Sequence, residues 1–589
     1  MLDLPKPKRG QSLTRRQLLA HFGMLGAGAL VAQPAASWAS GPGPGRLIAR
    51  AMAAKPAGSD LGAIEHIVFL MMENRSYDHY FGAYPRGRGF DDHPARSLGA
   101  FAQDYPHGPA LVPAGKLLPF HLDISSGTVE CTHDLTHSWG PMHLCWNHGR
   151  MDSWVSVHTS PTYEGSNGAM TMGYYDRSDL AFYYALADAF TLCDAYHCSI
   201  LGPTHPNRLM ANTGTIDPAG THGGPVTDTN VTPDVVWNCT WTTMQEVLED
   251  AGVSWKVYSP TNLGVSSRYS SLLGYPSWDP ALYNPILNPE VMGLSDHVLP
   301  YFSAFRDPTS SLYAKAFGPT FPTDLISDVA SGALPSVSWI IPPIGFDEHP
   351  SSSPTNGMYV TSLILDALTS NPEVWSKTAL ILMYDENDGW FDHVAPPTAP
   401  AGTEGEYLTA TAPKIGDPSP DTLGIAGPLG LGVRVPMLVL SPFSRGGHIA
   451  SELFDHTSQL KLISERFGVE VPNGSAWRRD TVGDLTSTLF RSEPDNSVPS
   501  LPVPGIDMPL GGACAEVSQD SETGGASPSV PTMQRMPKQG GGSRPASHYF
   551  ATTAEERAIP REHRTVIVGD GPTPVTTKSA YNRVAVRKS

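Results

Sequence analysis

The chain has 589 residues and a formal net charge of −18, and it contains 57 glycines and 56 prolines. Its length exceeds that of most single domains, but a large α/β enzyme with loop insertions can form one catalytic unit of this size. The acidic charge argues against a nucleic-acid partner, because polyanion binding depends on a positively charged surface.

The N-terminal residues 1–39 have the pattern of an export signal. Arg15 and Arg16 form a twin arginine, and a weakly apolar run rich in glycine and alanine follows them. This run is too short and interrupted to span a membrane, and small residues precede a cleavage position after Ala39. We therefore expect export by the twin-arginine route to the exterior or the cell envelope, with residues 40–60 as a linker.

Six cysteines in an exported chain permit disulfides, although the sequence does not fix their pairing. No two of them are spaced as Cys-x-x-Cys, which argues against a structural zinc site.

Two apolar runs end in polar residues. Residues 67–72 form an unbroken apolar run, which is typical of a strand buried on both faces of a parallel sheet, and Glu73 and Asn74 follow it. Residues 378–384 repeat the pattern and lead into Asp385 and Glu386. Ligands bind at the carboxyl ends of strands in open α/β sheets, and carboxylate and amide oxygens suit a hard cation. The two strands therefore predict one metal-centred pocket.

The loop at residues 202–208 is the strongest candidate for a nucleophile. Thr204 lies between Pro203 and Pro206, and the two prolines restrict the backbone around its hydroxyl. A rigid loop of this kind suits a nucleophile.

Later elements continue the α/β pattern. Thr243 and Glu246 form a capping box that opens a helix, and a strand is expected at 253–258. Residues 259–319 are predicted to be an insertion over the sheet edge. The remaining expected elements are strands near 191–194 and at 336–341 and 435–440, and helices at 182–190, 356–370 and 456–467.

Together these elements predict an α/β fold with a mostly parallel central sheet flanked by helices, in a catalytic domain at 61–500. Residues 501–589 lack periodicity, so we expect a disordered linker rich in glycine, serine and proline and a basic tail. A solvated tail is one interpretation, and a weak contact with anionic lipid is the other.

Four motifs together resemble the bacterial phosphoesterase family, which contains phospholipases C and secreted acid phosphatases. They occur in family order at Glu73–Gly82, Thr204–Arg208, Glu348–Pro350 and Tyr384–Val394. The likeness is greatest to the mycobacterial-type phospholipases C, through segments such as Gly252–Tyr258, and it covers about residues 64–490.

The resemblance implies an alkaline-phosphatase-like fold and phosphotransfer through a phospho-enzyme. It makes Thr204 the nucleophile, and it implies one divalent metal ion, such as calcium, magnesium, manganese or zinc. The ligands that it implies are Glu73, Asn74, Thr204, Asp385 and Glu386. The chemistry agrees, because a threonine hydroxyl needs a base or a cation to favour the alkoxide.

The leaving alkoxide also needs a proton, which a histidine can supply before it activates water. His349, His137 and His393 are the candidates in that order, although His137 has an ordinary hydrogen-bonding role as its alternative. Asn207, Arg208 and Trp390 are the candidates for substrate binding, and the alternative for Trp390 is packing in the core.

The predicted function is that of a secreted phospholipase C. It would hydrolyse phosphatidylcholine-like diesters to diacylglycerol and a phosphorylated head group through a phospho-threonine. Its expected partners are the phospholipid and, transiently, a membrane surface. A secreted acid phosphatase is the alternative, followed by a non-catalytic lipid-binding protein. Among the motif residues only Arg208 and Arg75 are fixed cations, which favours a diester over a dianionic monoester.

Overall fold

The computed structural model describes most residues between 58 and 545. The internal ranges of more than five residues that it leaves out are 93–99, 107–113, 161–167, 229–237, 260–295, 411–424, 490–501 and 505–529. The predicted signal at 1–39, most of the linker at 40–60 and most of the tail lie outside the described residues.

A mixed, mostly parallel sheet of seven strands forms the centre of the molecule, in the order β11-β6-β10-β9-β1-β8-β7. All neighbouring pairs are parallel except those of β10 with β6 and β9. The predicted α/β class and mostly parallel sheet are therefore confirmed. The strands are β1 (His66–Met72), β6 (Thr191–Cys193), β7 (Trp255–Tyr258), β8 (Val337–Ile340), β9 (Thr378–Tyr384), β10 (Met437–Leu440) and β11 (His448–Ala450).

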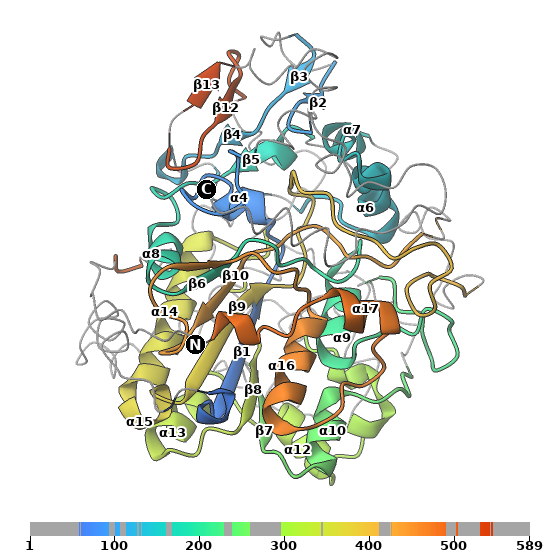
Figure 1. Ribbon diagram of the computed structural model, residues 1–589, viewed down its shortest axis with the longest axis vertical. Helices are drawn as coiled ribbons and strands as arrows, with labels where there is room; N and C mark the ends of the chain where they lie inside the picture. The colour runs from blue at the N-terminus through green and yellow to red at the C-terminus, as the bar shows by residue number, and fades with distance from the viewer. Residues whose placement is uncertain are drawn as a thin grey trace, which may run out of the picture.

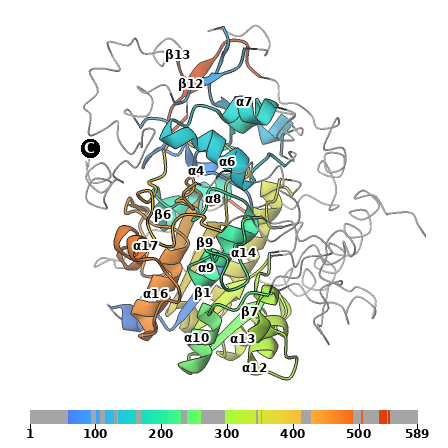
Figure 2. The same cartoon turned by 90° about the vertical axis from the view of Figure 1, so that its right-hand side faces the viewer.

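The central strands β1 and β9 are buried almost completely, as their unbroken apolar sequences predict. Helices cover both faces of the sheet (Figures 1 and 2), with α13 and α14 on one side and α9 and α16 on the other. The helices around the sheet are α8 (Ala181–Ala189), α9 (Thr204–Thr213), α10 (Met244–Asp250), α12 (Ser311–Phe317), α13 (Thr323–Ser331), α14 (Pro354–Ser370), α15 (Pro372–Trp375), α16 (Thr457–Phe467) and α17 (Ala476–Thr481).

A layer of short elements lies above the sheet in Figure 1, at the end where the carboxyl ends of β1 and β9 point. It consists of α4 (Tyr77–Phe81), α6 (Trp139–Trp146), α7 (Trp154–Thr159), β2 (Gln103–Asp104), β3 (Lys116–Leu117), β4 (Phe120–His121) and β5 (Gly173–Tyr174). Short 3₁₀ turns lie at Leu61–Ala63, Ile124–Ser126, Asn147–Gly149, Met170–Met172, Leu299–Tyr301, Ser303–Phe305 and Thr486–Thr488.

The C-terminal region differs from the predicted disordered tail, because it contains the antiparallel strands β12 (Arg535–Pro537) and β13 (Ser543–Pro545). The turn between them docks on the body. Gln539 Nε2 donates to the carbonyls of Tyr84 at 2.8 Å and Gly87 at 3.0 Å, and Met536 is fully buried. These contacts join residues far apart in the sequence, which local periodicity does not reveal.

The described cysteines Cys145, Cys193, Cys198 and Cys239 are buried and free. Cys131 and Cys514 lie outside the described residues. Within the described part of the chain, no helix is long and apolar enough to cross a membrane.

Candidate active site

The register of β1 and β9 brings together the four candidate ligands that follow these strands, which are Glu73, Asn74, Asp385 and Glu386. Met72 pairs with Tyr384 at the ends of the two strands, so Glu73 and Asp385 leave the sheet side by side. Asn74 has a left-handed backbone with a φ of 61°, which asparagine tolerates better than most residues. Its N–H donates to Asp385 Oδ1 at 3.2 Å. The side chains of all four residues are almost completely buried.

The Asn74 amide lies between two carboxylates. One terminal atom of this amide is 3.0 Å from Glu73 Oε2 and 2.5 Å from Glu386 Oε1. If that atom is nitrogen, it donates to both carboxylates. If it is oxygen, three oxygens face one another, and a cation between them would relieve their repulsion. The donor types therefore fit a hard divalent ion.

Thr204 reaches the same place from another element. It is the first residue of α9, and its Oγ1 donates to Glu73 Oε2 at 3.3 Å. The structure thus brings the proline-flanked hydroxyl beside the Glu73 carboxylate.

Asn207 braces this loop and does not face a substrate. Its Oδ1 accepts from the N–H groups of Ser199 and Ile200, both at 2.9 Å. Its Nδ2 donates to the carbonyls of Gly202 at 2.9 Å and Pro203 at 3.1 Å. The side chain is fully buried, and both its oxygen and its nitrogen make hydrogen bonds to the backbone. The predicted role in substrate binding therefore does not agree with its position.

Arg208 lies one turn after Thr204 and is surrounded by carboxylates. Its Nη2 contacts Glu73 Oε1 and lies 3.5 Å from Asp296 Oδ2, and its Nε lies 3.3 Å from Asp385 Oδ2. Burial lowers the pKa of Arg208, but the carboxylates of Asp296, Glu73 and Asp385 outweigh this effect and raise the pKa above its usual value. Arg208 is therefore a fixed positive charge beside the candidate nucleophile.

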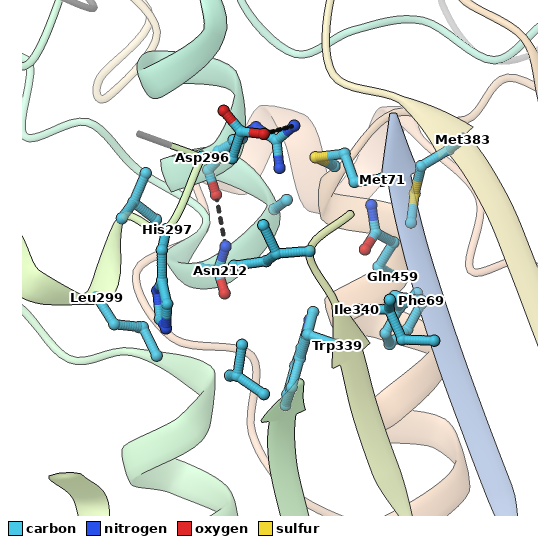
Figure 3. A pocket seen from close by; sticks show the side chains of 15 residues that line it. Phe69, Met71, Asn212, Asp296, His297, Leu299, Trp339, Ile340, Met383 and Gln459 are labelled. Atoms are coloured by element: carbon cyan, nitrogen blue, oxygen red, sulfur yellow. Dashed lines mark hydrogen bonds and ion pairs between the residues drawn. The ribbon is translucent and has the colours of Figure 1, made fainter. Parts of the chain in front are cut away.

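An apolar cavity adjoins this arginine (Figure 3). Its wall includes Phe69, Met71 and Trp339, and Asp296 lies at its polar side with Asn212. The sequence offered no signal for Asp296, which lies in the predicted insertion without a motif around it. A contact with Arg208 is visible only in three dimensions.

The carboxylates at this edge share an unusual electrostatic environment. Burial raises the pKa of Glu73 to about 7, and Asp385 contributes in the same direction. Burial also raises the pKa values of Asp385 and Glu386. It raises that of Asp347 as well, and Asp296 adds to this shift. Within the described residues, Arg208 is the only arginine or lysine with an ion pair to Glu73 or Asp385. The excess of negative charge fits the binding of a divalent cation.

His137 lies close to two carboxylates, those of Glu386 at this edge and of Asp388 two residues later. Its Nδ1 lies 3.0 Å from Asp388 Oδ1, and its Nε2 lies 3.7 Å from Glu386 Oε1. Burial lowers the pKa of His137, but Glu386 and Asp388 outweigh it and hold the pKa well above its usual value. The two carboxylates therefore favour the charged form of His137.

His349 is more accessible, with 29% of its side chain exposed. Its Nε2 lies 3.3 Å from Asp134 Oδ1, and its charge lowers the pKa of Glu73. It thus lies within electrostatic range of Glu73 and is partly open to solvent.

His393 and Trp390 occupy positions that do not agree with their predicted roles. The His393 side chain is fully buried, with Nδ1 2.6 Å from Asp78 Oδ2. Trp390 is also fully buried and stacks on His79, with ring centroids 3.7 Å apart. The chain turns into the interior after Glu386, so Trp390 follows its core-packing alternative and His393 lies in a separate polar network.

That network is a buried Asp/His group of the kind that could hold a metal, formed by Asp78, Asp392 and His393. Arg434 already lies within it, 3.0 Å from Asp78 Oδ1 and 3.0 Å from Asp392 Oδ2. The arginine supplies the counter-charge that a metal would otherwise provide. The group therefore reads as a structural ion-pair network.

The fold and these groups define an α/β protein with a buried threonine hydroxyl beside an edge of clustered carboxylates. Residues 64–470 match the Phosphoesterase family, and the chain belongs to that family, as the resemblance predicted.

Three relatives match most of the chain. It is 43% identical over 538 residues to Phospholipase C A of Mycobacterium tuberculosis strain H37Rv, covering 89% of this chain and 95% of that protein. It is 44% identical over 500 residues to Phospholipase C B of the same strain, covering 84% and 89%. It is 40% identical over 501 residues to the Non-hemolytic phospholipase C of Pseudomonas aeruginosa, covering 83% and 65%.

Among solved structures, a phosphonate monoester hydrolase of Agrobacterium radiobacter is 11% identical and covers 51% of this chain and 71% of that one. Its TM-score of 0.25 is too low to support an argument about this chain.

Proposed function

We propose that the protein is an exported phospholipase C that hydrolyses the bond between glycerol and phosphate. One observation carries the proposal: the Thr204 hydroxyl is held against Glu73 at an edge where Asn74, Asp385 and Glu386 converge. The relatives named phospholipase C match this chain over most of its length. The twin arginine at positions 15 and 16 supports export.

The residues present fit one divalent cation, which Glu73, Asn74, Thr204, Asp385 and Glu386 would hold. When bound, it would lower the pKa of the Thr204 hydroxyl and neutralise phosphoryl oxygens. Arg208 provides a second positive charge at the same place.

In the proposed reaction, the Thr204 hydroxyl passes its proton to Glu73 Oε2, to which it donates. Thr204 Oγ forms a bond to phosphorus, and the bond from phosphorus to the diacylglycerol oxygen breaks. His349 gives a proton to that oxygen, so that diacylglycerol leaves as an alcohol. The same histidine then takes a proton from water, which attacks phosphorus. The bond from phosphorus to Thr204 Oγ breaks, the proton on Glu73 returns to Oγ, and the phosphorylated head group leaves. His349 suits this role better than His137, which two carboxylates hold in its charged form.

The charge of the site supports a diester substrate. A monoester dianion would need more positive charge than Arg208 and one cation supply beside these carboxylates. Arg75 does not add to it, because its Nε donates to the Glu348 carbonyl at 3.0 Å and its Nη2 donates to the Ser352 carbonyl at 3.4 Å. Since Trp390 is buried, it provides no aromatic surface for a choline head group.

The experiment compares kcat/KM for phosphatidylcholine and for an aryl phosphate monoester at one pH. We expect the higher value for the diester, and a higher value for the monoester would indicate an acid phosphatase. Thr204→Ala should lower both by about 10³-fold or more, whereas Thr204→Ser should keep part of the activity. An alanine variant with wild-type turnover would show that Thr204 is not the nucleophile.

A further inference from the structure

Glu348 is buried in a cage of tyrosine hydroxyls. Its side chain is fully buried, and Tyr80 and Tyr384 both donate to its Oε2, the latter at 2.9 Å. Tyr183 donates to Oε1. The three tyrosines come from α4, β9 and α8, so the carboxylate ties together elements that are distant in the sequence.

Two further features hold the backbone around this carboxylate. Glu348 has a φ of 72°, in the left-handed region that a side chain rarely adopts without support from its surroundings. The Arg75 guanidinium donates to its carbonyl at 3.0 Å. On the opposite side, a Cβ at Gly357 would overlap Glu348 Oε1, so α14 leaves room for the carboxylate through a glycine.

The neighbours of Glu348 act on the catalytic edge. The Asp347 carbonyl accepts from the Glu73 N–H at 2.8 Å, and Asp347 Oδ1 accepts from the His349 N–H at 3.0 Å. The chain thus places Glu348 in the cage while the residues on both sides of it contact or influence Glu73.

We propose that Glu348 is a positioning residue, whose caged carboxylate fixes residues 347–350 so that His349 can protonate the leaving alkoxide. This inference rests on the proposed function, because it needs His349 as the acid. The family motif at Glu348–Pro350 thereby divides into an acid and the residue that holds it in place.

The test uses two substrates that differ in their need for an acid. The leaving group of phosphatidylcholine is the diacylglycerol alkoxide, which needs a proton. The leaving group of p-nitrophenyl phosphocholine is a stable phenolate, which does not. The ratio kcat/KM reports on the bond-breaking step for each. We expect Glu348→Gln to lower it by about tenfold or more for phosphatidylcholine, and by less than about threefold for the aryl substrate.

Tyr183→Phe removes one hydrogen-bond donor and keeps the carboxylate. It should also lower kcat/KM more for phosphatidylcholine than for the aryl substrate, by a smaller factor than Glu348→Gln does. The neighbouring Tyr184 is the matched control, since it is equally buried in α8 and its hydroxyl has no hydrogen-bond partner among the described residues. Tyr184→Phe should leave both substrates unchanged. If Glu348→Gln does not fold, the result for Tyr183→Phe decides alone.

Equal loss on both substrates, or no loss on either, would overturn the proposal. His349→Ala, measured in parallel, separates this failure from that of the proposed function. If His349→Ala loses activity mainly on phosphatidylcholine but the Glu348 and Tyr183 variants do not, only the positioning role is wrong. If wild-type protein hydrolyses neither diester, or His349→Ala shows no selectivity, the proposed reaction itself is wrong.

Discussion

Replacing Arg434 by methionine removes the positive charge from the buried ion-pair network that this arginine forms with Asp78 and Asp392. The buried guanidinium uses all five of its N–H groups. Nε donates to Asp392 Oδ1 at 3.0 Å, and Nη1 donates to the carbonyls of Arg88 at 2.7 Å and Asp194 at 2.9 Å. Nη2 donates to Asp78 and Asp392, both at 3.0 Å. Methionine has a similar length, so the change is mainly electrostatic.

The expected loss of stability follows from the carboxylates that remain. Asp78 and Asp392 would share His393 as their counter-charge in a fully buried site. Breaking a buried ion pair costs about 3–5 kcal/mol, and we expect a loss of unfolding free energy in that range at neutral pH. One carboxyl can relieve the repulsion by binding a proton.

The pH dependence has a defined sign. Burial already raises the pKa of Asp392, and removal of Arg434 would raise it further. A carboxyl whose pKa is higher in the folded than in the unfolded state destabilises the fold above its unfolded pKa of about 3.9, and the penalty fades as the pH falls through the folded value. The difference between wild type and Arg434→Met should therefore be smaller at pH ~5.5 than at pH ~7.5.

Equilibrium urea unfolding at the two pH values measures both effects. Arg177→Met is the control, because Arg177 pairs with Asp188 at 2.7 Å but has a side chain that is 49% exposed. The unfolding free energy of Arg177→Met should fall by less than about 1 kcal/mol. A loss below about 1 kcal/mol for Arg434→Met at neutral pH, or a larger loss at the lower pH, would refute this reasoning.

Three further predictions concern the metal, the C-terminal strands and export. Glu73→Gln should lower bound metal, measured by elemental analysis, together with diesterase activity; active protein that contains no ion and survives exhaustive chelation would contradict this. A chain ending at Ser529 should be less stable than one ending at Pro545, by about 2 kcal/mol from the buried methionine of β12 alone; equal urea midpoints would show that this docking contributes nothing. Arg15→Lys combined with Arg16→Lys should leave the protein in the cytoplasm, since the export machinery recognises the guanidinium pair, and cell fractionation tests it.

The meeting of Glu73 and Asp385 could be predicted from the sequence because its physical causes are local. A parallel strand buried on both faces must be apolar throughout, so β1 and β9 are visible as continuous apolar runs. Their polar successors therefore had to meet once the strands paired in register, and Met72 does pair with Tyr384. The capping box at Thr243 is local in the same sense and opens α10 as expected.

Roles that depend on the direction of a side chain after the strand ends could not be predicted in this way. Asp388 has a φ of 55°, and its N–H donates to Glu386 Oε2 at 2.5 Å. This turn sends Trp390 and His393 into the interior. A run of acidic and aromatic residues such as 385–393 fits a substrate pocket equally well, so only the tertiary packing separates the two interpretations.

The braces between the motifs explain why the site needs more than its reacting groups. The segment after β1 carries the candidate ligands Glu73 and Asn74, but its Arg75 holds the Glu348 loop and its Asp78 joins Arg434. The segment after β9 divides in the same way, since Asp385 and Glu386 remain at the edge while Asp392 enters the arginine network.

These motifs thus carry candidate reacting groups together with residues that fix neighbouring segments. In α9, Asn207 performs the second task for Thr204 by binding the loop that precedes it. Because these braces are buried and made of charged or fully hydrogen-bonded groups, their loss should lower stability and turnover together. Loss of a reacting group such as the Thr204 hydroxyl should lower turnover and leave the unfolding free energy nearly unchanged. This difference separates the two classes of motif residue experimentally.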